Sequence, residues 1–109
     1  MAVYHITFRI AKTTTNETLL GASTYQQRYE RFLEKLKENK TGGFWSEPTS
    51  FVIVETNLDI YTFTKNVTVG LDKQQDLVLV HDPKNGDARY IGIENEAILK
   101  SFLPNAVKL

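Results

Sequence analysis

The first ten residues of this 109-residue chain alternate between apolar and polar side chains, which is the pattern of a β-strand with one buried face. Successive side chains on a strand point to opposite sides of the sheet. The apolar set consists of Tyr4, Ile6, Phe8 and Ile10. The polar set consists of His5, Thr7 and Arg9. We expect the first set to lie in the core and the rest of the chain to pair with this strand or to cover it.

The composition fits one domain over residues 1–109, because 41% of the residues are hydrophobic and 24% are charged. The 13 basic and 13 acidic side chains cancel, so a nucleic-acid partner needs a local basic patch. The chain has no cysteine, which excludes disulfides and thiolate metal sites. It has neither a secretion signal nor a stretch of the roughly 20 apolar residues that span a membrane. We therefore expect a cytoplasmic protein with no membrane contact.

Two segments have helical periodicity. From Tyr25 to Asn39 the apolar residues recur every three or four positions, with Ser23 or Thr24 as candidate cap and a charged side, including Arg28, that we expect to face solvent. Residues 57–71 are rich in β-branched and aromatic side chains, which favour strands. Their large apolar residues nevertheless recur with helical spacing, so we predict a helix capped by Thr56 or Asn57. An extended conformation of residues 61–69 is the alternative.

The remaining segments predict strands and one short helix. Residues 50–55 and 76–81 are apolar on both faces, as in strands that are covered on each side. A short strand at 44–47 ends before Pro48, which cannot donate to a ladder. Turn residues at 82–87 predict a hairpin to a strand at 88–93, and the helix that follows ends at Pro104. We attribute the aspartates of this half to turns; they are Asp72, Asp76, Asp82 and Asp87.

This order of elements predicts an α+β fold: a ferredoxin-like split βαββαβ arrangement with an added C-terminal hairpin strand and a short terminal helix. Both main helices then lie on one face of the sheet. The other face exposes apolar side chains of the strands at 50–55 and 77–80. We therefore predict a homodimer that packs on this face or through the edge of the added hairpin. A monomer whose C-terminal helix folds over the face is the alternative.

The stretch from Gly43 to Val54, together with the strands around Tyr4–Phe8 and Asp76–Val80, resembles the small SinR-like proteins. These are relatives of the VapD-type toxins and of the small ferredoxin-like CRISPR-associated endoribonucleases. The resemblance implies a ferredoxin-like dimer and a link to RNA or to toxin and defence systems. In the nuclease relatives it implies a divalent metal held by an Asp at the end of the first strand. Arg9 matches that position here, and a cation is no ligand for Mg²⁺, so we expect no metal and no cofactor.

Two sets of residues are candidates for chemistry. His5, Thr7 and Arg9 form the candidate catalytic row, because His5 and His81 are the two histidines, the residue type that exchanges a proton near neutral pH. The candidate nucleic-acid contacts are Arg9 and Lys12 for phosphate and Trp45 for base stacking.

Each candidate also has a structural reading. For the row we favour a buried polar dimer interface, and for Trp45 with Phe44 we favour anchoring of a loop to the core. Three functions stay open: a dimer of undetermined activity associated with RNA, an endoribonuclease that uses the His-Thr-Arg row, and a non-enzymatic assembly or regulatory domain.

Overall fold

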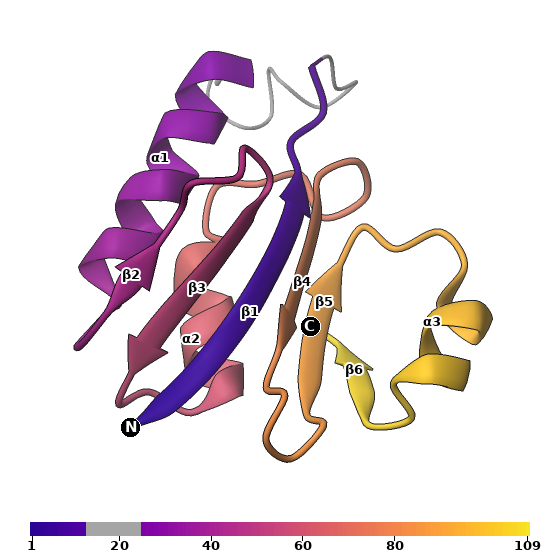
Figure 1. The fold of residues 1–109 in the computed structure, drawn as a ribbon. Coiled ribbons are helices and arrows are strands. Elements are labelled where there is room, and N and C mark those ends of the chain that lie inside the picture. The colour runs from indigo at the N-terminus through magenta and orange to yellow at the C-terminus, as the bar shows by residue number, and fades with distance from the viewer. Residues whose placement is uncertain (13–24) are drawn as a thin grey trace.

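The computed structural model describes residues 1–12 and 25–109. In these residues six strands form one sheet and three helices pack against it, so the predicted α+β class is confirmed (Figure 1). The strands are β1 (Ala2–Arg9), β2 (Phe44–Trp45), β3 (Phe51–Thr56), β4 (Leu77–His81), β5 (Ala88–Ile91) and β6 (Ala106–Lys108). The helices are α1 (Tyr25–Glu38), α2 (Ile60–Val67) and α3 (Glu96–Phe102).

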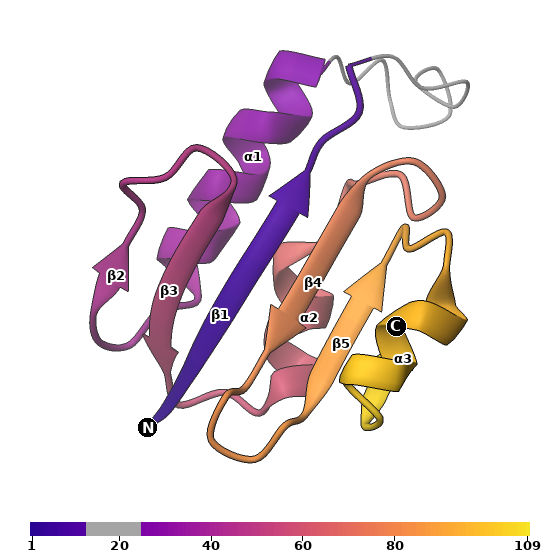
Figure 2. The same cartoon turned by 45° about the vertical axis from the view of Figure 1, so that its right-hand side comes forward.

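The opening strand β1 lies inside the sheet, whose strand order is β2-β3-β1-β4-β5-β6. It pairs antiparallel with β3 on one side and with β4 on the other, and only β5 and β6 are parallel. Figure 2 shows α1 and α2 behind the sheet and α3 beside β5, and β6 pairs with β5 at that edge (Figure 1). The expectation that later strands pair with the first one is therefore confirmed.

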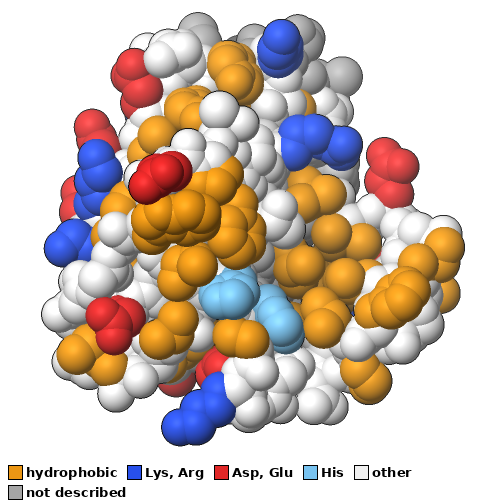
Figure 3. All heavy atoms as spheres, viewed as in Figure 1, with side chains coloured by type: hydrophobic (Ala, Val, Ile, Leu, Met, Phe, Trp, Pro, Cys, Tyr) orange, Lys and Arg blue, Asp and Glu red, His pale blue; other side chains and the backbone are white. Residues whose placement is uncertain are grey.

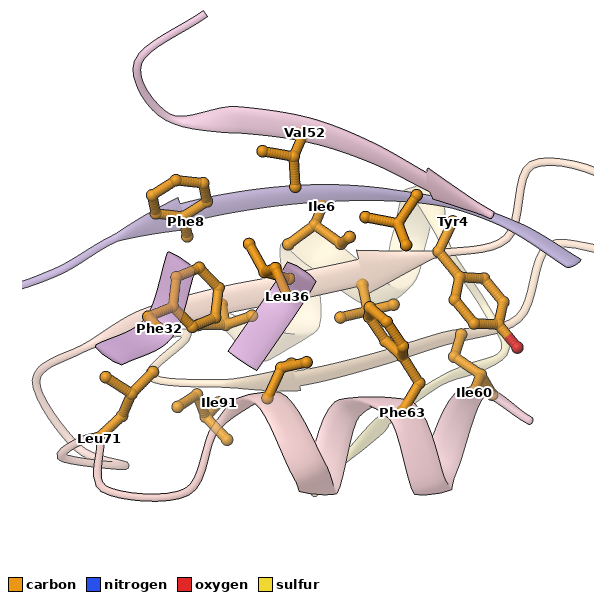
Figure 4. Close-up of a cluster of buried hydrophobic side chains, with 14 of the residues drawn as sticks. Tyr4, Ile6, Phe8, Phe32, Leu36, Val52, Ile60, Phe63, Leu71 and Ile91 are labelled. Atoms are coloured by element: carbon orange, nitrogen blue, oxygen red, sulfur yellow. The ribbon is translucent and has the colours of Figure 1, made fainter. Parts of the chain in front are cut away.

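The core lies between the sheet and the two main helices. The apolar set of β1 is buried there as predicted, and Phe8 packs on Phe32 of α1 with ring centres 4.8 Å apart. Tyr4 packs on Phe63 of α2 at 5.3 Å. Figure 4 shows these side chains meeting in the layer between sheet and helices. Burial of such large side chains supplies the main driving force for this fold.

The segment 57–71, in which β propensity and helical spacing conflict, contains helix α2. The extended alternative for residues 61–69 is therefore wrong. The predicted caps are also wrong, because Asp59 caps α2 and accepts a hydrogen bond from the Thr62 amide at 3.1 Å. Thr56 instead ends β3, and its hydroxyl donates to the Asn39 carbonyl at 2.7 Å. The helical spacing of buried residues outweighs β propensity here, because it lets one side of the helix cover the sheet. The predicted caps of α1, Ser23 and Thr24, lie outside the described residues.

The C-terminal segment differs from the prediction. Helix α3 ends before Pro104 as expected, but the chain then returns as β6 alongside β5, which the sequence pattern did not indicate. Leu99 and Leu103 pack on a small second cluster around Tyr90. Helix α3 therefore covers the β5–β6 end of the sheet and leaves β1 and β3 uncovered (Figures 1 and 2). No helix in residues 1–12 and 25–109 is long and apolar enough to cross a bilayer.

Candidate functional site

The face of the sheet opposite α1 and α2, which we call the open face, carries every candidate residue of β1. Alternation along the strands places there the apolar or aromatic side chains of Val3, Trp45, Phe51, Ile53, Leu77 and Leu79. Its polar side chains include His5, Thr7, Arg9 and His81. All of these residues retain some solvent exposure, whereas their neighbours on the same strands are buried in the core. The open face is thus the part of the sheet available to a partner.

The two histidines lie side by side at the centre of this face. His5 on β1 is the direct cross-strand partner of His81 on β4. Their ring centres are 6.5 Å apart and the rings are nearly perpendicular, at 80°. Within the described part of the chain neither imidazole makes a hydrogen bond or an ion pair, and Figure 3 shows both at the surface between two apolar areas. The expectation that their strands are neighbours is confirmed.

The histidines continue a line of aromatic rings across four strands. His5 lies edge-on to Phe51 with ring centres 5.7 Å apart, and Phe51 lies edge-on to Trp45 at 6.3 Å. We call Trp45, Phe51, His5 and His81 the ring row. Trp45 is 42% exposed, so its predicted role as an anchor to the core is wrong; its neighbour Phe44 faces the other way and packs against the core.

The predicted His-Thr-Arg row shares one face but not one compact site. Thr7 donates to the Ser50 carbonyl at 3.4 Å, and Arg9 lies opposite Leu77 near the end of β1. His5 and Arg9 are four positions apart on an extended strand, which is a distance of about 13 Å. His81, rather than Arg9, is therefore the group next to His5. Lys12 lies beyond the strand and is exposed, as a phosphate contact requires.

Sequence reasoning missed a buried ion pair at the end of β1. Arg28 of α1 and Asp76, expected to face solvent and to serve a turn, are 1% and 0% exposed. The Arg28 Nε donates to Asp76 Oδ2 at 3.2 Å, and the amides of Ala11 and Asp72 donate to the same carboxylate at 2.8 Å each. The pair therefore joins β1, α1 and the α2–β4 connection. The four-residue spacing of Arg28, Phe32 and Leu36 is a signal that Arg28 lies on the buried side of α1. No local pattern identifies its partner, because Asp76 is 48 residues away.

Comparison with protein-family models, with curated proteins and with solved structures finds no match to this chain. In the part of the chain that the structure describes, no three His, Cys, Asp or Glu side chains gather into a metal-binding group.

Proposed function

We propose that this protein is a ferredoxin-like assembly domain of the SinR-like and VapD-like type, which works as a homodimer with two open faces packed on each other. The strand order β2-β3-β1-β4 with antiparallel neighbours supports the ferredoxin-like arrangement, because a split βαββαβ chain produces this order. Strands β5 and β6 with α3 are additions at one edge. The resemblance of the segment Gly43–Val54 to those families supports a dimer with a link to RNA.

The apolar character of the open face carries this proposal. Its centre presents Phe51 and Ile53 of β3, and Leu79 of β4 lies on the other side of β1. Leu79 packs on the cluster around Tyr90 that α3 helps to cover, whereas α3 leaves β1 and β3 uncovered (Figures 1 and 2). A stable interface buries about 800 Å² on each partner, roughly an eighth of the 6355 Å² surface of this chain. An isologous contact between two such faces removes this apolar area from water, which is the main favourable term in association.

Sedimentation velocity of the wild-type protein and of Ile53→Glu tests the assembly. The wild type is expected to sediment as a dimer at micromolar concentration. Ile53→Glu should weaken dimerisation at least about 100-fold, because it places a charge against its own copy in a desolvated interface.

Val69→Glu is the matched control, since Val69 is 58% exposed and follows α2 on the helix side. It should dimerise like the wild type. If the wild type sediments only as a monomer at tens of micromolar, the proposed dimer is contradicted. Circular dichroism of each variant shows whether the fold is intact.

A second candidate function, contact with single-stranded RNA, is favoured by the ring row. Trp45 is exposed beside Phe51, and aromatic side chains on an open sheet face stack unpaired bases. Arg9 and Lys12 at the end of β1 would meet the phosphates. Fluorescence anisotropy with labelled RNA at low salt should show weaker binding by Trp45→Ala, by about 5- to 100-fold. Wild-type protein that binds no RNA even at low salt leaves assembly as the function.

The endoribonuclease alternative is tested with the same RNA. Here the observation is the adjacency of His5 and His81, which supplies a base for a 2′-hydroxyl and an acid for the leaving oxygen. Cleavage is measured with and without Mg²⁺ for the wild type, His5→Ala and Arg9→Ala. Loss of cleavage in His5→Ala alone would support the histidine pair. Cleavage unchanged from the wild type in both variants would end this assignment.

A further inference from the structure

We infer that His5 and His81 form half of a transition-metal site, which the same two histidines of a second copy complete around one Zn²⁺-class ion. This inference rests on the proposed dimer. It differs from the Mg²⁺ site of the nuclease relatives in place, ligand type and metal, because neutral imidazoles bind zinc, nickel and copper and do not suit Mg²⁺.

The geometry within one chain fits two ligands of one ion. Zinc binds an imidazole nitrogen at about 2.0–2.1 Å, so two imidazoles on one tetrahedral ion have ring centres roughly 5 Å apart. His5 and His81 stand at 6.5 Å as direct cross-strand partners. Rotation of the two side chains closes the remaining distance without moving the strands, because both rings lie on the same face of adjacent strands.

The surroundings leave both imidazoles available. Neither makes a hydrogen bond or an ion pair within residues 1–12 and 25–109. Phe51 packs edge-on against His5, and Leu79 lies two residues before His81 on the same face. These apolar neighbours limit the positions the rings can take and keep water away from one side of the pair. A cation at this point therefore meets two partly ordered ligands.

One chain supplies only part of a zinc site. Structural zinc has four protein ligands, and the described residues contain no group of three ligating side chains. A twofold axis near the histidines, which lie between the two apolar areas of the open face in Figure 3, brings four imidazoles together. The ion then bridges the copies, so metal binding and dimerisation strengthen each other.

The test measures metal binding and assembly separately. Isothermal titration of the dialysed wild-type protein with ZnCl₂ should give one ion for every two chains. Sedimentation with ZnCl₂ and with EDTA should show dimerisation at least about tenfold tighter with zinc. Co²⁺ in place of Zn²⁺ should give the visible absorption of a tetrahedral site. His5→Phe and His81→Phe keep an apolar ring in the interface but remove the ligand, and each should abolish zinc binding while leaving metal-free dimerisation intact.

The outcomes distinguish this inference from the proposed function. A metal-free dimer that binds no zinc at 100-micromolar levels overturns the metal site and leaves the dimer. A metal-free monomer that dimerises with zinc supports the metal site and overturns assembly through the apolar face alone. A monomer under both conditions overturns both. One ion bound per chain without dimerisation overturns the shared site, as does unchanged zinc binding by both Phe variants.

Discussion

Replacing Arg28 with methionine should destabilise the fold strongly, although we expected Arg28 to face solvent. In the structure it shares the buried side of α1 with Phe32 and Leu36. The guanidinium is buried and donates through Nε to Asp76 and through Nη2 to the Ala11 carbonyl. Methionine keeps an apolar stem of similar length and removes both donors. The variant therefore leaves the Asp76 carboxylate buried without its charge partner.

The expected loss is about 3–4 kcal/mol. Removing one partner of a buried pair costs about 3–5 kcal/mol. The backbone amides of Ala11 and Asp72 still donate to Asp76, which places the cost near the lower limit. The unpaired Ala11 carbonyl adds about 1 kcal/mol. A domain of this size has a free energy of unfolding of about 5–15 kcal/mol. The variant therefore retains only part of that stability.

Urea unfolding followed by circular dichroism measures the effect. The midpoint should fall by about 1–4 M, given typical slopes of 1–3 kcal/mol per molar urea. Lys35→Met on the same helix is the control, because its ion pair with Glu38 at 3.6 Å is exposed and should change stability by about 0.5 kcal/mol or less. Adding Asp76→Asn to Arg28→Met should recover part of the loss. A single Arg28→Met variant within about 1 kcal/mol of wild type would refute the reasoning.

Three further predictions follow from local geometry. Gly92→Ala should unfold much of the protein or lower its melting temperature sharply, since Gly92 has φ +71° and an added Cβ would lie 2.1 Å from the Asp76 carbonyl oxygen. Burial raises the pKa of Tyr4 to about 12, so the folded state loses up to about 2–3 kcal/mol as pH rises from 10 to 12. Tyr4→Phe should remove this alkaline loss in pH-dependent unfolding. The hydrogen bonds that Thr62 donates hold the pKa of Asp59 below its usual value, so Asp59→Ala should lower the melting temperature at neutral pH and have little effect in strong acid, where the carboxylate is protonated.

Strand β1 and both main helices follow from periodicity alone. Alternation in residues 2–10 identified which side chains of β1 are buried, and the spacing of Ile60, Phe63 and Val67 predicted a helix against β propensity. Both patterns are local consequences of burying one side of an element. The added strand β6 was missed because three residues after a proline carry no period, and its pairing with β5 comes from the preceding helix turning the chain back.

In the candidate site, too, some features follow from the local sequence pattern and others arise only when distant segments pair. The sequence by itself determined that His5, Thr7 and Arg9 share a face, because side chains alternate on any strand. Only the tertiary structure decided that His81 is the neighbour of His5, and that Trp45 and Phe51 continue the line of rings, because strand order and register depend on pairing between distant segments. The same holds for Arg28 and Asp76, whose charges are compatible with burial only because the folded chain places them in contact.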